Sequence, residues 1–400
     1  MNLTEDNVIA YFQPIISADS NDVYAFEVLG RYIDENGEVN SLGSFFNNPK
    51  ISHDEALRVD RMVRRYAMKK YAEEKRTEYL FINIRLVWLL PYVDKPEEMK
   101  TLQLAKEFGI PNEKLVIEIT EEDFNASEEY IRAIVHYKIA GCRIALDDYG
   151  KEASNIDRLA KLQPDIIKIN IDYIHNCENS YHYREYLRAI AAFADSVGIE
   201  VLHEGVETER QLDICISSKG RFYQGFLLAR PQPSMIDPNV NKFIFSALIA
   251  NAYSAIQNKV TKAEALKNSI DILVERFLKE NAFSYERIIN NDYLTKLFRA
   301  LPEVIRIYLC NRKGMQLSNN IEKQGDKVVC REFQNKNWAW RGYFHEIIKA
   351  FIRGRKSCLT NSYRDFTTKE KIRTYCYAIN EDVFLLADIT KELERKEHAA

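Results

Sequence analysis

Over the first 235 residues, short apolar runs alternate with stretches in which apolar residues recur every three or four positions. The first pattern is typical of buried strands and the second of amphipathic helices. It predicts strands at 8–16, 23–33, 79–84, 114–119, 143–148, 166–170, 199–203 and 222–228. It predicts helices at 51–74, 96–108, 127–140, 154–162, 181–197 and 208–217. Such alternation implies right-handed βαβ units and a parallel sheet, and this length favours a closed (β/α)8 TIM-like barrel.

The pattern changes after this region. Residues 237–283 carry a broad apolar face, which predicts one or two long helices. They suit a signalling or dimerising linker and a helix packed on the barrel equally well. From about 285, shorter strands dominate, at 303–310, 315–318, 356–365, 371–379 and 383–389, with a helix at 344–352. We therefore divide the chain into a barrel domain (1–235), linker helices (236–284), a small α+β domain (285–390) and a charged tail (391–400).

Composition and charge narrow the class of protein. The net charge of −3 argues against a nucleic-acid polymer as the partner. No run of about 18 apolar residues exists to span a membrane, and the N-terminus lacks a signal-peptide pattern, so we expect a cytoplasmic protein. Seven dispersed cysteines without a CxxC pair, and seven histidines without HExxH, disfavour disulfides and a zinc site.

Polar residues stand at or just past the ends of the predicted barrel strands. In such barrels the carboxyl ends of the strands carry the active site. Any one of these residues could be an ordinary polar strand end, and an isolated Asp-Asp pair is usually a solvated turn. Together they predict one functional rim, formed by Asn83, Glu118, Asp147, Asp148, Lys168, Glu204 and Gln224.

The acids of this rim indicate a site for hard metal ions. Carboxylates crowded in one cleft raise one another's pKa unless cations lie between them. Glu118, Asp147, Asp148 and Asn83 offer oxygen ligands only, which suits Mg²⁺, Mn²⁺ or Ca²⁺. Two such ions about 3.5–4 Å apart would drive in-line displacement at phosphorus. Lys168 would then orient the attacking water or stabilise negative charge. From the residues alone we predict metal-dependent hydrolysis of a phosphate ester.

The ordered motifs resemble the EAL-domain family of cyclic di-GMP phosphodiesterases. Glu27-Val28-Leu29-Gly30-Arg31 is similar to the signature ExLxR, Glu118-Ile119-Thr120-Glu121 to ELTE, and Asp147-Asp148-Tyr149-Gly150 to DDFG. The match continues through Pro164–Ile169, Glu204–Glu207 and Gln224-Gly225-Phe226 to Arg230-Pro231. Each motif alone is weak evidence, whereas their order and spacing agree over about residues 1–235.

The resemblance implies a barrel with an antiparallel first strand, and hydrolysis of cyclic di-GMP to linear pGpG with Mg²⁺ or Mn²⁺. Calcium would bind as a non-productive ion. The implied metal ligands are Glu27, Asn83, Glu118, Asp147 and Asp148. The implied catalytic residues are Lys168, Glu204 and Asp147. The implied substrate contacts are Gln13, Leu29, Arg31, Gln224, Glu207 and Pro231. The resemblance also implies a homodimer.

Two departures from the family pattern bear on turnover. The family continues after DDFG with a glycine- and serine-rich loop, whereas Lys151-Glu152-Ala153-Ser154-Asn155 follow here. The family's lysine-any-aspartate motif ends here in Asn170 instead of an acid. With both changes we still expect the protein to bind the nucleotide, whereas its hydrolysis of the nucleotide is in question. The alternative function is therefore a catalytically impaired receptor that binds cyclic di-GMP and signals without turnover.

The second half resembles PAS or Cache-type sensor domains in its architecture, and the order of domains resembles the YkuI-like subgroup of EAL proteins. We expect this domain to bind an unknown small molecule or protein. Its aromatic cluster, Trp338, Trp340, Tyr343 and Phe344, could line a ligand pocket. Such clusters are more often core, and core is our prediction here.

Overall fold

The computed structural model describes residues 3–120, 127–150, 156–281, 291–325 and 327–390. The chain divides into two compact units, Met1–Ile256 and Gln257–Ala400. None of the helices in these described ranges combines the length and apolar character needed to cross a membrane.

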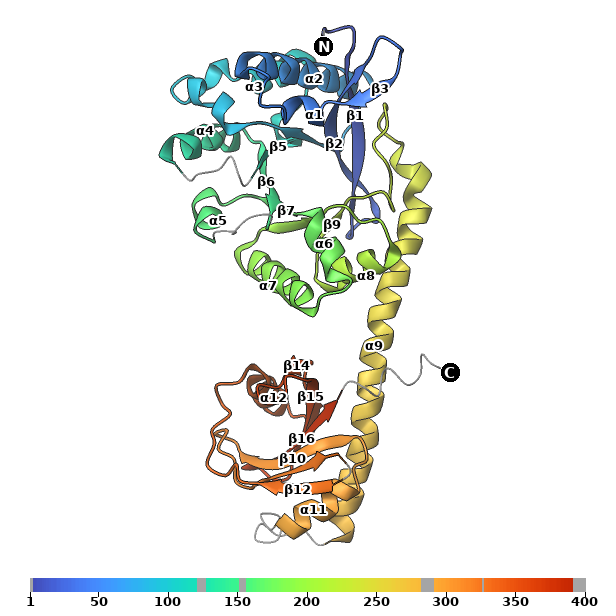
Figure 1. The fold of residues 1–400 in the computed structure, drawn as a ribbon, viewed down its shortest axis with the longest axis vertical. Coiled ribbons are helices and arrows are strands. Elements are labelled where there is room, and N and C mark those ends of the chain that lie inside the picture. Colours follow the sequence, from blue (N-terminus) through green and yellow to red (C-terminus); the bar gives the residue numbers. More distant parts are fainter. Residues whose placement is uncertain (1–2, 121–126, 151–155, 282–290, 326, 391–400) are drawn as a thin grey trace. The chain divides into compact units, whose positions relative to one another are not determined.

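The first unit is a closed barrel of eight strands (Figure 1). The strands are β1 (Val8–Ser17), β2 (Asp22–Ile33), β4 (Tyr79–Asn83), β5 (Leu115–Thr120), β6 (Arg143–Tyr149), β7 (Ile166–Ile169), β8 (Glu200–His203) and β9 (Phe222–Tyr223). Neighbouring strands from β2 to β9 pair in parallel, whereas β1 pairs antiparallel with both β2 and β9 and closes the ring. The barrel and its antiparallel first strand are confirmed. A short strand, β3 (Val39–Ser41), extends β2 at one side.

Helices cover the outside of the barrel. They are α1 (Gly43–Phe46), α2 (His53–Glu73), α3 (Lys100–Phe108), α4 (Glu128–Ile139), α5 (Ile156–Leu162), α6 (Ile171–Cys177), α7 (Tyr181–Val197) and α8 (Glu209–Ser217). Short 3₁₀ turns at Leu86–Trp88, Leu90–Tyr92, Pro96–Glu98 and Asn112–Lys114 join some of them to strands. Local sequence fixes several ends: Ser52 accepts a hydrogen bond from Glu55 N, Thr208 and Gln211 form a capping box, and Gly198 ends α7.

The barrel interior contains a layer with one apolar side chain from each strand. The layer consists of Ile15, Ala25, Phe81, Val116, Ala145, Ile166, Leu202 and Phe222, all fully buried. This layer closes the barrel beneath its carboxyl-terminal rim and fixes which positions above it face inward, because side chains alternate along a strand.

Two predictions for the first unit were wrong in detail. The strand predicted at 222–228 is only the two-residue β9, because the backbone leaves the sheet at Gly225. A Cβ on Gly225 would lie 2.1 Å from Val206 O, so only glycine allows this close approach. Helix α6 was not predicted, although Asn170 is an effective N-cap for it.

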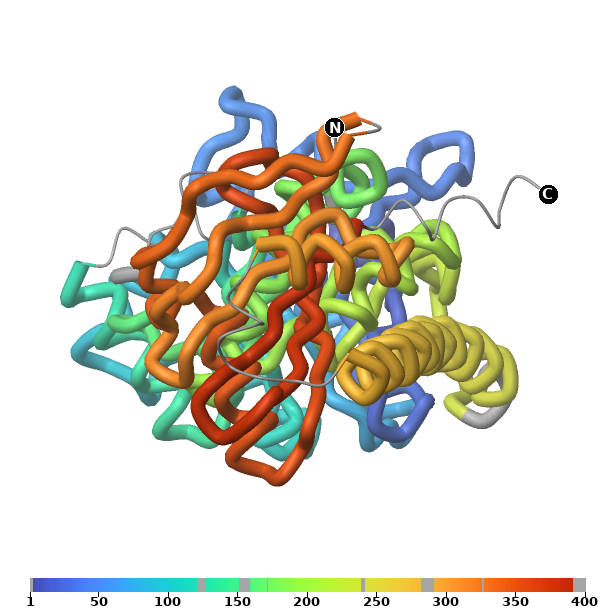
Figure 2. Tube along the Cα trace, turned by 90° about the horizontal axis from the view of Figure 1, so that it is seen from below, coloured from blue at the N-terminus to red at the C-terminus, as the bar shows by residue number. Residues whose placement is uncertain are grey.

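The second unit is built on an antiparallel sheet of seven strands. They are β10 (Val304–Asn311), β11 (Asn320–Gln324), β12 (Lys327–Arg331), β13 (Ser357–Leu359), β14 (Tyr363–Arg364), β15 (Lys371–Ala378) and β16 (Val383–Thr390). The long central strands β10, β16 and β15 lie side by side (Figure 2). One face packs against Ile270 and Val274 of α9 (Pro238–Glu280) and against α11 (Asn291–Arg299). The other face packs against α12 (Gly342–Ile352).

Here too the sequence misplaced some strands. Residues 315–318 are not a strand, although Gln316 forms an isolated bridge with Cys310. The segment 356–365 is divided into β13 and β14, and the charged strand β12 was not predicted. Strand β12 has four of five residues exposed or charged, so it carries no apolar periodicity that could identify it.

Candidate functional site

The predicted rim residues form the next inward-facing layer of the barrel. Except for Asp148, each lies two positions beyond the apolar layer, within its strand or just past the strand's end, and two positions is one period of side-chain alternation. In the antiparallel β1 the same step runs backwards, from Ile15 to Gln13. The layer so defined contains Gln13, Glu27, Asn83, Glu118, Asp147, Lys168, Glu204 and Gln224. The fold therefore brings these distant residues together because the strands are in register.

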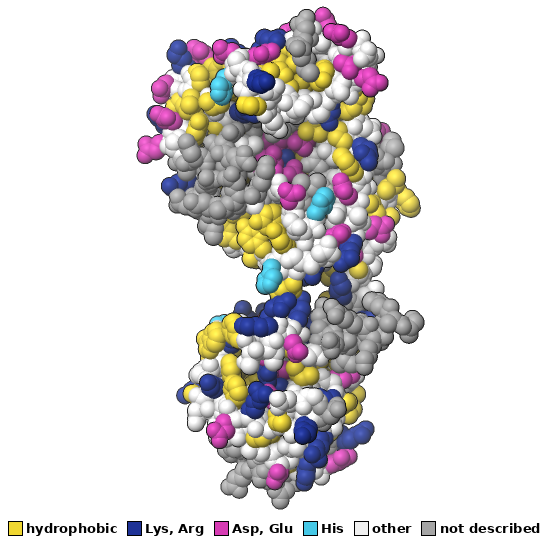
Figure 3. Space-filling view, in the orientation of Figure 1, with side chains coloured by type: hydrophobic (Ala, Val, Ile, Leu, Met, Phe, Trp, Pro, Cys, Tyr) yellow, Lys and Arg dark blue, Asp and Glu magenta, His cyan; other side chains and the backbone are white. Residues whose placement is uncertain are grey.

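Four carboxylates of this layer surround the ammonium group of Lys168. Its Nζ lies 2.6 Å from Glu118 Oε1, 2.8 Å from Glu204 Oε1, 3.2 Å from Asp147 Oδ1 and 3.5 Å from Glu27 Oε1. Lys168 is 1% exposed and Glu118 is fully buried. Acidic side chains gather in a hollow on this face of the barrel (Figure 3). One buried cation cannot neutralise four acids, so the site holds excess negative charge.

The protonation equilibria of the site reflect this imbalance. Burial raises the pKa of the Glu118 carboxyl well above its usual range, and it raises that of Glu204 to about 8. Burial alone would lower the pKa of Lys168, but Asp147 and the other acids raise it well above its usual value. Lys168 therefore keeps its positive charge, while Glu118 and Glu204 bind protons more readily than ordinary glutamates do.

Strand β6 directs its two adjacent aspartates to different places. A bulge interrupts its pairing with β7 between Leu146 and Tyr149, and Asp148 has a left-handed backbone with φ 55°. Adjacent residues of a regular strand point to opposite faces, and a bulge changes these directions. Asp147 contacts Lys168, whereas Asp148 Oδ1 accepts a 2.5 Å hydrogen bond from Asn170 Nδ2. Strained backbone of this kind is common at functional sites.

The carboxylate of Glu27 is held by two amides. Asn83 Nδ2 lies 3.4 Å from Glu27 Oε1, and Gln224 Nε2 donates to Glu27 Oε2 at 2.6 Å. Gln13, opposite Glu27 in the β1–β2 register, donates instead to Ala229 O at 3.2 Å. Glu27 and Asn83 are thus fixed in one corner of the site, beside the opening of a cavity.

This cavity, of about 410 Å³, adjoins the carboxylate cluster and is lined by Asn83 and Asp148. Leu29 and Arg31 of β2 also line it. The guanidinium of Arg31 donates to Gly30 O and lies 5.4 Å from the centre of the Tyr11 ring. Arginine in such a position can bind a phosphate group through its planar fork of donors.

Two of the predicted substrate contacts lie away from the carboxylate cluster. Glu207 is 43% exposed and lies 3.9 Å from His175 Nε2. Its backbone N–H donates to Gln211 Oε1, so the residue belongs to the start of α8. Pro231 is half-buried and does not line the cavity beside Asp148.

Other residues line the same cavity and were not predicted. They include Arg85, Trp88 and Thr120. Arg85 lies 5.7 Å from the Trp88 ring centre and donates to Phe46 O. Arg85 follows Asn83 by two residues, so its position just beyond a strand end was the available signal. The altered loop, Lys151 to Asn155, lies outside the described residues.

The donor set fits divalent cations by its chemistry. Glu118 Oε2 is buried and accepts no hydrogen bond from any described residue. The five carboxylates of Glu27, Glu118, Asp147, Asp148 and Glu204, with the one ammonium, carry four formal negative charges, which two divalent ions would balance. In the described residues the acids converge on Lys168, and no cluster of three or more His, Cys, Asp or Glu has metal-site geometry. Metal binding would therefore require these carboxylates to turn partly away from the ammonium.

Comparison with known proteins identifies the family. The model of the EAL domain matches residues 1–231. The chain belongs to the EAL-domain family. A second model, described as an EAL-domain associated signalling protein domain, matches residues 237–398.

Several relatives of this EAL-domain protein are known. It is 32% identical to the uncharacterized EAL-domain containing protein YkuI of Bacillus subtilis, over 96% of this chain and 94% of that protein. The crystal structure of YkuI, in complex with the substrate c-di-GMP and calcium, matches with a TM-score of 0.85 at 30% identity and covers 97% of each chain. The cyclic di-GMP phosphodiesterase RocR of Pseudomonas aeruginosa is 25% identical over 56% of this chain and 57% of its own.

Proposed function

We propose that this EAL-domain protein binds cyclic di-GMP at the carboxyl-terminal rim of its barrel and hydrolyses it to linear pGpG. The observation that carries the proposal is the buried group of four carboxylates around Lys168, which opens beside a cavity lined by Arg31. The crystal complex of YkuI with c-di-GMP and calcium supports the choice of ligand.

Each residue has a role in this proposal. Glu27, Asn83, Glu118 and Asp147 would hold one Mg²⁺ or Mn²⁺, and Asp147, Asp148 and Glu204 a second. When bound, these ions supply the positive charge that activates water and stabilises the phosphoryl oxygens. Lys168 positions the attacking water through its ammonium group. Gln13, Leu29, Arg31, Gln224, Glu207 and Pro231 contact the nucleotide.

A second function has a specific observation in its favour. Asn170 replaces an acid of the family motif, and its amide is bonded to Asp148, one of the two ligands that we assign to the second ion alone. A neutral amide attracts a cation less than a carboxylate does. Weak binding of the second ion would leave a receptor that binds cyclic di-GMP without cleaving it.

One paired experiment tests both functions. Affinity for cyclic di-GMP is measured by calorimetry, and pGpG release is measured with Mg²⁺ and then Mn²⁺ at the same protein concentration. Glu118→Gln keeps the size of the side chain and removes its charge, so it should abolish product and weaken metal-dependent affinity at least tenfold. Glu209→Gln, an exposed acid on α8, is the matched control and should behave as the natural protein.

The outcomes of this experiment distinguish the phosphodiesterase from the receptor. Tight binding with metal-dependent pGpG shows the phosphodiesterase, and tight binding with no product in either metal shows the receptor. An absence of binding would contradict both. We further propose that the protein is a cytoplasmic homodimer. Light scattering on the purified chain would test the dimer.

A further inference from the structure

The second unit contains a cavity of about 760 Å³ that the barrel chemistry does not use. It is lined by β10, β11, β12 and β16 and by the segment 363–370. Its volume lies within the range of about 300–1,000 Å³ found for small-molecule sites. A smaller hollow shares the lining residues Arg341, Tyr343, Tyr363 and Phe366 with it.

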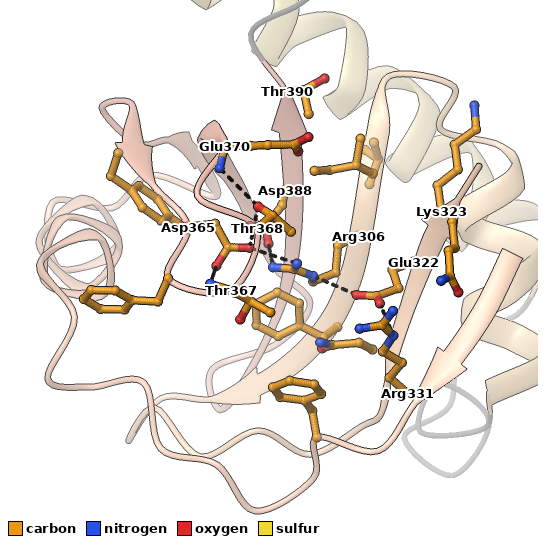
Figure 4. Close-up of a pocket in the computed structure, with 18 of the residues that line it drawn as sticks. Arg306, Glu322, Lys323, Arg331, Asp365, Thr367, Thr368, Glu370, Asp388 and Thr390 are labelled. Atoms are coloured by element: carbon orange, nitrogen blue, oxygen red, sulfur yellow. Dashed lines mark hydrogen bonds and ion pairs between the residues drawn. The ribbon is translucent and has the colours of Figure 1, made fainter. Parts of the chain in front are cut away.

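One wall of the cavity carries a closed network of ion pairs. Arg306 lies 3.1 Å from Glu322, 2.9 Å from Asp365 and 3.0 Å from Asp388. Figure 4 shows Arg306 between the two aspartates on one side and Glu322 on the other. Arg331 also pairs with Glu322, at 2.6 Å. These two arginines are therefore already neutralised by acids and have little free charge to offer a ligand.

Arg341 differs from both, because it has aromatic neighbours and no acid. Its guanidinium carbon lies 4.0 Å from the ring centre of Phe366 and 5.2–5.5 Å from those of Tyr363, Trp340 and Tyr343. The residue is only 9% exposed, yet its guanidinium has no carboxylate or hydrogen-bond acceptor among the described residues. Its nitrogens are not among the fully enclosed atoms that lack partners, so they face open space. The residue is enclosed as a whole while its donor nitrogens stay accessible, so an anion that enters the cavity can bind them.

The backbone next to Arg341 points to the same kind of partner. Arg341 is the N-cap of α12, an 11-residue helix, and its side chain makes no capping hydrogen bond. No described residue accepts from the N–H groups of Gly342 and Tyr343. N-caps are normally Ser, Thr, Asp or Asn, and a cation is unfavourable at the positive end of the helix dipole. An anion bound there would offset both costs, as it does at many helix N-termini.

We propose that the N-terminus of α12, with Arg341 and the N–H groups of Gly342 and Tyr343, binds the anionic group of a small organic ligand at the residues that this cavity shares with the smaller hollow, which Gly342 lines. The group is a carboxylate or a phosphoryl group, since both accept bonds from a guanidinium fork and from backbone N–H groups. The aromatic rings around Arg341 provide apolar surface for the rest of the ligand. The stacked pairs are Trp340 with Phe366 and Tyr343 with Tyr363.

This inference revises the prediction for the aromatic cluster. Phe344 is buried in the core, as expected. Tyr343 is buried in the same core and also lines the cavity. Trp338 packs against this core and lines the cavity, whereas Trp340 is 65% exposed. Within the cluster, the sequence did not distinguish core positions from lining positions, because all four are aromatic and adjacent.

The test uses simple probes on the full chain. Benzoate presents an aromatic carboxylate, benzamide is its neutral counterpart, and phenyl phosphate and inorganic phosphate present the alternative anion. Binding is measured by calorimetry and by the shift in Tm of the natural protein, Arg341→Met and Arg331→Gln. Arg331 lines the same cavity but is paired with Glu322, so Arg331→Gln is the matched control.

We expect benzoate or phenyl phosphate to bind saturably, and benzamide to bind at least tenfold more weakly. Arg341→Met should lose at least tenfold in affinity for the anion, whereas Arg331→Gln should keep it. The probe that binds more tightly shows whether the site prefers a carboxylate or a phosphoryl group. Binding of inorganic phosphate and of neither organic anion would mean an adventitious ion only, and this result would overturn the inference. It would also be overturned if neither organic anion bound at 10 mM, or if Arg341→Met bound them as the natural protein does.

A structural role for Arg341 gives a different result. If Arg341 mainly stabilised the fold through its contacts with the aromatic rings, Arg341→Met would lower the Tm of the probe-free protein. Because the charge is unpaired and buried, we expect its loss to leave the Tm of the probe-free protein unchanged or raised.

Discussion

At the scale of single residues, the charge of the barrel site depends on the group that contacts each carboxylate. Lys168 contacts four carboxylates, and burial, reinforced by the neighbouring acids, raises the pKa of Glu118 and Glu204. Asp148 is satisfied differently, by the neutral amide of Asn170. In our proposal, the neutral amide at position 170, where the family motif has a carboxylate, weakens the attraction of this corner of the site for a second cation.

Asn170→Asp should therefore strengthen binding of the second metal ion and raise kcat about tenfold, equal to about 1.4 kcal/mol of transition-state stabilisation. Aspartate is also a good N-cap, so α6 should keep its cap bond to Asp172 N. Metal-dependent pGpG release measures the effect. Asn176→Asp, the same change at an exposed position of α6, is the control. Equal activity in all three proteins would contradict our view of Asn170.

Asp388 provides a pH-dependent prediction in the second unit. Burial raises its pKa to about 6, although Arg306 and Thr374 stabilise the charged form. The pKa in the unfolded chain is about 3.9. Between these two values the folded state binds the additional proton. The contribution of Asp388 to stability should therefore increase as pH falls from above 6 to about 4, by about 3 kcal/mol in total.

The measurement is the free energy of unfolding between pH 4 and 8 for the natural protein and for Asp388→Asn. The natural protein should gain about 3 kcal/mol of stability relative to Asp388→Asn as the pH falls from above 6 to about 4. Asp382→Asn, the same change at an exposed position of the second unit, is the control. A flat difference curve for Asp388→Asn would show that its carboxyl titrates normally.

At the scale of elements, the last barrel strand is short and its end is set by backbone geometry. β9 has two residues, and the turn that follows depends on Gly225, whose α-carbon approaches the peptide of Val206. This turn places Gln224 against Glu27. The end of one strand therefore positions a carboxylate on another.

Gly225→Ala should destabilise the barrel by roughly 2–4 kcal/mol, since the new Cβ would clash with backbone that cannot move aside. Thermal unfolding of the variant measures this. Gly198→Ala is the comparison: its φ is also positive, at 75°, but nothing lies within 4 Å of the new Cβ, so it should cost about 1 kcal/mol. Equal losses in both variants would mean that backbone conformation, and not the clash, dominates at Gly225.

At the scale of the whole molecule, two compact units carry two different candidate sites. The barrel offers acids to metal ions and a nucleotide, whereas the second unit offers a cation to an anion. Ligands of one site should stabilise mainly the unit that binds them, because a ligand raises the stability of the state to which it binds.

Scanning calorimetry tests this separation. Cyclic di-GMP with Ca²⁺, at about 100 times its Kd, should stabilise the barrel transition by about 2.7 kcal/mol and leave the other transition unchanged. The preferred anionic probe should do the reverse. A single transition that both ligands shift together would show that the units unfold as one.

The sequence by itself determined the class of fold and most members of the barrel site. Apolar residues recur with different periods in strands and helices, so the pattern shows the type of each element. Side chains of a strand alternate between its two faces, and this alternation places Glu27, Glu118, Lys168 and Glu204 on one inner layer. Local patterns are sufficient here, because inward positions of a barrel alternate regularly.

Only the tertiary structure decided the features that arise between distant segments. The bulge at Asp147-Asp148, the bond from Asn170 and the partnerless Arg341 depend on which residues meet in space. The sequence does not distinguish an arginine that is paired with acids, such as Arg306, from one that is surrounded by four aromatic rings, such as Arg341. The chemistry of each arginine is set by those neighbours, and the fold alone supplies them.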